Sequence, residues 1–217
     1  VNITSNENAV CNSFSQGEFL SSENGLIGNI RLINEANFES SRSHLANYLN
    51  PQLSYEVPDI VLFFSDVNVP KRNFTEGFVA KDNNILSVNG ERLIEYFNVN
   101  LTGRIKTMDL EQYGEYELAT ISDDGSMIKV DGEVYTESLN PHSAKMICRS
   151  SDEGRYISFG ENEEHGIEIN YFQGPRTAIA LQFIWRKKSS DDLSRSQFCG
   201  ESFTDPSRFS LLESEGW

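Results

Sequence analysis

Apolar and polar residues alternate with a period of two along much of the middle of the chain. In Ala180–Arg186, the side chains of Leu181, Phe183 and Trp185 share one face of an extended segment. Because successive side chains of a strand point to opposite faces, this pattern predicts a strand with one buried face. The same alternation recurs in segments 96–103, 114–120 and 166–172. The run Pro58–Phe64 is more continuously apolar, which is typical of a strand buried on both faces.

Asp-Gly and Asn-Gly pairs separate these segments. They lie within residues 87–92, 122–126 and 130–133, and they predict turns of the hairpin kind. Only Asn37–Leu49 has a helical pattern, which Pro51 ends. Many short strands with turns between them predict an all-β fold, an antiparallel, jelly-roll-like β-sandwich with short helical and loop insertions.

Composition divides the chain into three parts. A polar lead segment covers residues 1–23, the strand-rich body covers 24–188, and a second polar segment covers 189–217. The two polar segments lack the alternation that would give them a core of their own. We expect the C-terminal segment to pack on the sandwich.

The chain is strongly acidic. Its 18 Lys and Arg residues against 33 Asp and Glu residues give a formal net charge of −15. Nucleic-acid binding requires a basic face that neutralises phosphates, so we predict no nucleic-acid partner and regard cations as the natural small partners. No apolar run approaches the roughly 20 residues that cross a bilayer, so we expect no transmembrane segment. The oligomeric state is left open by the sequence.

Signatures of enzyme chemistry are missing from the sequence. There is no nucleophile elbow, no HExxH zinc motif, no phosphate-binding glycine loop and no dinucleotide fingerprint. His44, His142 and His165 lie far apart along the chain, and each is better interpreted as an ordinary surface or hydrogen-bonded histidine. Paired acidic residues lie in polar, loop-like stretches rather than in an evident cleft. We therefore predict a protein that is not an enzyme.

Three cysteines are present, Cys11, Cys148 and Cys199, without the spacing of a zinc site. A polar segment without a core gains most from attachment to a rigid body, so we predict a disulfide between Cys148 and Cys199. Spacing alone leaves Cys11–Cys199 and Cys11–Cys148 open as alternatives. Because such bonds persist outside the cytoplasm, they favour an extracellular or cell-surface location, with the periplasm also compatible.

Asp123 and Asp124 stand side by side between two predicted strands. Asp-Asp-Gly is good turn chemistry without any metal, and this is the simpler interpretation. In a regular strand the two carboxylates would point to opposite faces, whereas a cis peptide would bring them to the same side. A hard cation such as Ca²⁺, which takes six to eight oxygen ligands, would suit that arrangement.

Gly114–Tyr135 resembles the signature of the PA-14 (PA14) domain family, which includes the anthrax protective-antigen domain, yeast flocculins, epithelial adhesins, and modules of bacterial adhesins and glycosidases. Residues 141–150 resemble its next strand region. Gly166–Trp185 resembles its late hairpin, with a Tyr-Phe-Gln-Gly turn and a terminal tryptophan. The likeness extends over about residues 24–188 and implies a β-sandwich.

The resemblance also implies a site. In lectin members of the family an Asp-cis-Asp pair holds calcium, and vicinal sugar hydroxyls complete the ion's coordination. Carried over, the pair is Asp123 and Asp124, Gln173 supplies its amide oxygen to the metal, and Arg176 donates hydrogen bonds to the sugar. The predicted function is a calcium-dependent, lectin-like or adhesin-like module that binds glycans with vicinal hydroxyls. The alternative is a structural or protein-interaction sandwich that binds no glycan.

Overall fold

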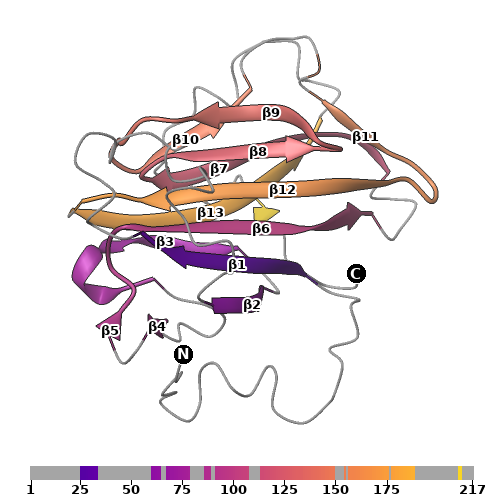
Figure 1. Ribbon diagram of the computed structural model, residues 1–217. Coiled ribbons are helices and arrows are strands. Elements are labelled where there is room, and N and C mark those ends of the chain that lie inside the picture. Colours follow the sequence, from indigo (N-terminus) through magenta and orange to yellow (C-terminus); the bar gives the residue numbers. More distant parts are fainter. Residues whose placement is uncertain are drawn as a thin grey trace, which may run out of the picture.

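The computed structural model describes residues 25–33, 60–64, 67–78, 86–88, 91–107, 113–149, 154, 156–175, 177–188 and 210–211. These residues form two antiparallel sheets that face one another (Figure 1), so the all-β sandwich is confirmed. Their helical residues are confined to one turn of 3₁₀-helix, η3 (Phe74–Glu76), which follows β3. The predicted helix at residues 37–49 lies outside the described residues.

Sheet A has the strand order β2-β1-β6-β12-β8-β9. Its strands are β1 (Leu26–Leu32), β2 (Ile60–Phe64), β6 (Phe97–Lys106), β8 (Ser126–Val130), β9 (Glu133–Ser138) and β12 (Glu164–Gln173). Sheet B has the order β10-β7-β13-β14, with β11 pairing to β7 and β3 pairing to β13. Its strands are β3 (Asn68–Asn73), β7 (Gly114–Asp123), β10 (Lys145–Cys148), β11 (Ile157–Phe159), β13 (Ala178–Lys187) and β14 (Ser210–Leu211). A separate small hairpin joins β4 (Ser87–Val88) to β5 (Glu91–Arg92).

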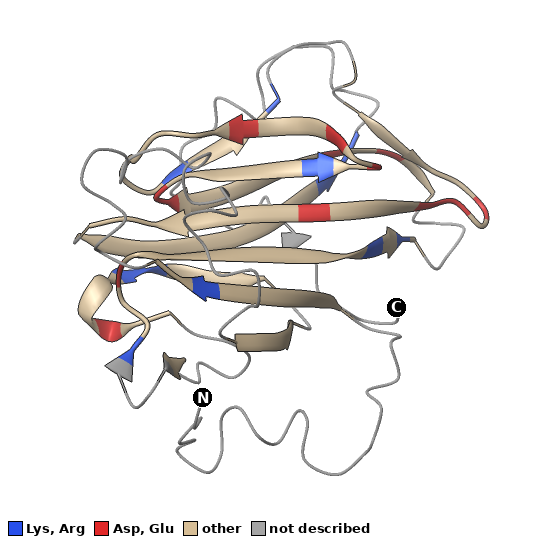
Figure 2. Cartoon of the chain, in the orientation of Figure 1, with Lys and Arg blue, Asp and Glu red and all other residues tan. Residues whose placement is uncertain are grey.

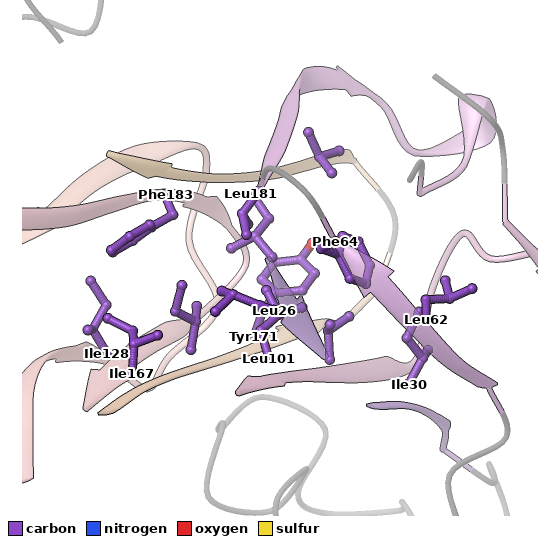
Figure 3. Close-up of a cluster of buried hydrophobic side chains, with 14 of the residues drawn as sticks. Leu26, Ile30, Leu62, Phe64, Leu101, Ile128, Ile167, Tyr171, Leu181 and Phe183 are labelled. Carbon is purple, nitrogen blue, oxygen red and sulfur yellow. The ribbon is translucent and has the colours of Figure 1, made fainter. Parts of the chain in front are cut away.

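The hydrophobic core fills the space between the inner faces of the two sheets (Figure 3). Leu181 and Phe183 of sheet B lie opposite Ile169 and Tyr171 of sheet A, and all four side chains are at most 1% exposed. The alternation in the sequence therefore predicted the buried faces of these strands correctly. Burial of such side chains stabilises the fold by roughly 1.5–3 kcal/mol each.

The prediction for Pro58–Phe64 was wrong. Among the described strands, β2 lies at the edge of sheet A and pairs with β1 alone. Its burial alternates, with Leu62 in the core and Val61 41% exposed. An unbroken apolar run thus forms an edge strand with one exposed face, because the composition of a strand does not say how many neighbours it has.

Two of the predicted hairpin turns are present. Asp131 and Gly132 both have positive φ, 51° and 87°, and connect β8 to β9, as an Asp-Gly hairpin turn requires. Strands β4 and β5 are also paired, although residues 89 and 90 between them lie outside the described residues. The 122–126 turn is different. Strand β7 belongs to sheet B and β8 to sheet A, so this connection crosses between the sheets and the hairpin prediction was wrong.

A second crossing lies at the same end of the sandwich (Figure 1). Strand β12 belongs to sheet A and β13 to sheet B, so the expected late hairpin is also a connection between the sheets. Part of the C-terminal segment contributes β14, in which Ser210 and Leu211 are the partners of Trp185 and Ile184. The boundaries of the three sequence parts stay a prediction. Within the described ranges no helix is long and apolar enough to span a membrane.

His165 links the two sheets at the opposite end of the sandwich. Its Nδ1 lies 2.7 Å from a carboxylate oxygen of Asp131, and its Nε2 lies 2.8 Å from the main-chain oxygen of Ser158 in sheet B. Burial alone lowers the pKa of His165, but these hydrogen bonds and the charges of Asp131 and Glu163 outweigh it, so the pKa is raised. Both partners are oxygen acceptors, so a doubly protonated imidazolium can donate to the two of them, which agrees with the raised pKa.

We expect this contact to make stability depend on pH. A raised histidine pKa contributes stability that is complete below the unfolded value of about 6.5 and is lost as the pH rises through the higher folded value. Asp131→Asn should flatten that part of the profile, by less than about 1 kcal/mol because both side chains reach solvent. Urea denaturation at several pH values between about 5 and 9 measures it. A variant with the wild-type profile would contradict the prediction.

Candidate metal and ligand site

The candidate site lies where the two sheet crossings meet. Asp123 ends β7, and Asp124 and Gly125 carry the chain over to β8. The peptide bond between the two aspartates is cis, as the resemblance implied. The neighbouring crossing, which follows β12, reaches the pair through Gly174, whose main-chain N–H donates to Asp124 Oδ2 at 2.8 Å. From the loop before β10, the Ala144 N–H donates to Asp123 Oδ2 at 2.9 Å.

Both carboxylates are buried, at 2% exposure for Asp123 and 6% for Asp124. Burial raises the pKa of Asp124 to about 6; the charge of Asp123 adds to the shift, while main-chain hydrogen bonds from Gly174 and His142 oppose it. Burial also raises the pKa of Asp123, against the hydrogen bond from Ala144 and the positive charge of Lys71. The pair is therefore two desolvated carboxylates that repel one another, an arrangement that a bound cation would stabilise.

Tyr171 supports the main chain of this pair from the core. Its hydroxyl lies 2.6 Å from the main-chain oxygen of Asp123 and also contacts the amide oxygen of Gln173, so one proton serves two acceptors. Burial, followed by the charges of Asp124 and Asp123, raises the pKa of Tyr171 well above its usual value. The hydroxyl therefore stays a neutral donor. The sequence placed Tyr171 in the core but did not reveal this polar contact.

Gln173 belongs to the same buried frame. Its side chain is fully buried, and its Nε2 donates to the main-chain oxygen of Ala178 at 3.0 Å. The amide oxygen, which accepts from Tyr171, has a second lone pair that a metal could use. The geometry shows Gln173 bracing the crossing between β12 and β13, and its role as a metal ligand stays a prediction.

Three buried hydroxyl groups form hydrogen bonds between the sheets beside the connection from β7 to β8. Ser126 Oγ of sheet A lies 2.7 Å from Thr120 Oγ1 and 3.0 Å from Ser122 Oγ of sheet B, and all three side chains are buried. Since Thr120 and Ser122 point inward, alternation along β7 places Asp123 on the outer face of sheet B. The Asp123 side chain thus lies on the side of sheet B that faces away from the core, although only 2% of the residue is exposed.

The remaining predicted residues fall outside the site or outside the described ranges. Arg176 is not described, so its contact with a sugar stays a prediction. Cys148 forms a disulfide bond, but its partner lies outside the described residues, and the pairing with Cys199 stays a prediction. The donors Ala144 and Gly174 were missed by sequence reasoning, because every residue but proline has a main-chain N–H and no side-chain pattern marks these two.

The two carboxylates of Asp123 and Asp124 suit a hard cation, which would take its remaining ligands from other oxygen atoms. In the described part of the chain no group of three or more His, Cys, Asp or Glu side chains could hold a metal, so further ligands would have to be other oxygens. Asp123 and Asp124 fit Ca²⁺, which accepts carboxylate, carbonyl and hydroxyl oxygens in a flexible shell. When bound there, the ion would supply a positive centre for neutral oxygen ligands.

The fold and the site together place this chain among β-sandwich domains in which two adjacent aspartates lie at a connection between the sheets. No family model matches the chain, and no curated protein does. A solved structure described as the PA14 sugar-binding domain from an RTX adhesin is similar over 89% of this chain and 97% of that one, at 19% identity and a TM-score of 0.60. The PA14 domain of the antifreeze protein MpAFP covers 89% and 90%, at 14% identity and a TM-score of 0.56. The chain therefore has the PA14-domain fold.

A further similar structure is an anti-sigma factor domain-containing protein, at 16% identity and a TM-score of 0.53. The match covers 89% of this chain but 46% of that one. The PA14-like fold thus also occurs as a portion of a longer protein.

Proposed function

We propose that this chain is a calcium-dependent carbohydrate-binding module of the adhesin type. The observation that carries the proposal is the buried Asp123–Asp124 pair, whose carboxylates are oriented by main-chain amides at the rim of the sandwich. Support comes from the similar solved structure described as a sugar-binding PA14 domain. The proposed location is extracellular or at the cell surface, and the disulfide of Cys148 favours it.

Each part of the site has a distinct role in this proposal. Asp123 and Asp124 bind the ion, Ala144 and Gly174 hold one oxygen of each carboxylate in place, and the ion's remaining positions accept two neighbouring hydroxyls of a sugar. A vicinal diol replaces two waters with two oxygens already at a suitable separation. Direct contacts are few, so the affinity for a monosaccharide should be about millimolar, roughly −4 kcal/mol, and adhesion would depend on several copies.

A binding module explains the site better than an enzyme does. Main-chain amides donate hydrogen bonds to the two carboxylates, and a buried tyrosine and a buried glutamine hold the neighbouring main chain; these contacts orient the pair. A structural or protein-interaction sandwich is the second candidate. It is favoured by the similarity to the anti-sigma factor domain-containing protein, of which this fold is one portion.

Saturation-transfer NMR with fucose, mannose, glucose and galactose tests the proposal. We expect transfer to at least one of these sugars in calcium and none after chelation with EDTA, because the ion supplies the contact with the hydroxyls. A glycan array in calcium extends the test to larger ligands. Binding that survives EDTA, or no binding by any glycan on a broad array, would favour the structural module instead.

A further inference from the structure

A lysine occupies the rim beside the paired aspartates. Strand β3 pairs with β13 through Ile179–Arg72 and Leu181–Val69, with a bulge between these two pairs. The bulge leaves two residues of β3, Pro70 and Lys71, opposite the single residue Ala180. Ala180 is in turn the partner of Asp123 on β7. Lys71 and Asp123 therefore flank the same small residue from opposite sides.

The side chain of Lys71 is exposed on this rim. Val69, Ile179 and Leu181 point into the core, whereas Ala180 and Asp123 alternate to the outer face, and the bulge brings Lys71 to that side. Figure 2 shows basic residues on β3 beside η3, at the end of the sandwich where the two crossings lie. The charge of Lys71 is close enough to act on the Asp123 carboxylate. Within the described residues Lys71 forms no ion pair.

Lys71 is a positive charge beside the two aspartates of a strongly acidic chain. The chain carries a formal charge of −15, but a bound Ca²⁺ ion would balance the charges of Asp123 and Asp124, and the ammonium of Lys71 would then add one positive charge beside the ion. A neutral sugar uses the ion but not the ammonium. A sugar whose ring also carries a carboxylate can place it toward the ammonium, which is a mobile point charge on a flexible stem.

We infer that Lys71 makes the site selective for acidic sugars, with uronic acids as the ligand class. This inference rests on the proposed function, since it names the ligands of the same site. The ammonium is exposed, so its contribution should resemble that of a surface ion pair and give about a threefold to tenfold preference for a uronic acid over the matching neutral sugar. The preference should weaken with added salt, because exposed charges are screened.

The test compares galacturonate with galactose, and glucuronate with glucose, by NMR titration in calcium. Wild type should favour the acid of each pair. At saturating calcium, Lys71→Met should remove that preference, so that the acid and the neutral sugar of each pair bind this variant with similar affinity. Lys187→Met is the matched control, since it removes an equal charge from an exposed lysine at the far end of β13, and it should keep the wild-type preference. Asp124→Asn, which lacks the proposed ion, reports any uronate that binds elsewhere.

The outcomes separate the inference from the proposed function. Equal affinity for acid and neutral sugar in the wild type, or an acid preference that Lys71→Met retains, overturns the inference while the module still binds sugar. If neither member of either pair binds in calcium, the proposed function fails, and the role of Lys71 fails with it. A preference lost equally in Lys71→Met and Lys187→Met would show a general charge effect and also overturn the inference.

Discussion

Replacing Asp124 with asparagine should abolish the rise in melting temperature that we expect calcium to give the wild-type protein. A ligand that binds only the folded state stabilises it by about 2.7 kcal/mol at a hundred times its Kd. Asparagine keeps an oxygen but loses the charge, and hard cations favour charged oxygen ligands. We expect calcium affinity to fall on the order of 100-fold or more, as measured by calorimetric titration of chelator-treated protein.

The same substitution should have the opposite effect without calcium. In the absence of the ion, Asp124 is a buried carboxylate beside another, and its pKa is raised by burial and by the charge of Asp123. Asparagine relieves that repulsion and can still accept the hydrogen bond from Gly174. The chelated variant should therefore melt at the wild-type temperature or above it. This pair of results distinguishes a lost ligand from a damaged fold.

Glu133→Gln is the matched control for charge. Glu133 is exposed at the start of β9, and its substitution also removes one negative charge. That variant should keep the full response to calcium. Wild-type protein that melts at the same temperature with and without millimolar calcium would remove the calcium site from the proposal.

The sequence predicted which faces of the strands are buried, but it did not predict which strands pair with one another. Which side of a strand is buried depends on a period of two, so the alternation in segments 96–103, 166–172 and 180–186 predicted the buried faces that hold Val99, Ile169 and Leu181. Which sheet a strand joins depends on partners far along the chain. Residues 122–126 have the composition of a hairpin turn, yet they connect the two sheets, and the hydroxyls of Ser122 and Ser126 form a hydrogen bond between those sheets.

The site shows the same limit. Asp123 and Asp124 could be identified from the sequence because they are consecutive acidic residues. Their main-chain donors come from Ala144, 21 residues from Asp123, and Gly174, 50 residues from Asp124, and neither has a side-chain signal. No sequence pattern marks Lys71, which the bulge of β3 places beside Ala180. Residues that are brought to a site by the pairing of strands cannot be predicted until that pairing is known.

Gly125→Ala should destabilise the fold strongly, because both a buried ring and a main-chain oxygen occupy the place of the added Cβ. A Cβ at residue 125 would lie 2.3 Å from Cε1 of Phe172 and 2.6 Å from the main-chain oxygen of Ser138. Phe172 is fully buried, and Ser138 belongs to β9, so neither can withdraw without disturbing sheet A. The cost of such overpacking is roughly 3 kcal/mol. Urea denaturation measures it through the midpoint at unchanged slope.

Gly132→Ala supplies the comparison. A Cβ there would meet nothing within 4 Å, but the residue has a φ of +87°, which costs an alanine about 1 kcal/mol. A larger loss at residue 125 than at residue 132 therefore measures crowding at the sheet crossing rather than backbone conformation. Because Gly125 directly follows Asp124, the crowded variant should also bind calcium more weakly, whereas Gly132→Ala should bind it normally. Equal stability of Gly125→Ala and wild type would contradict the tight packing around residue 125.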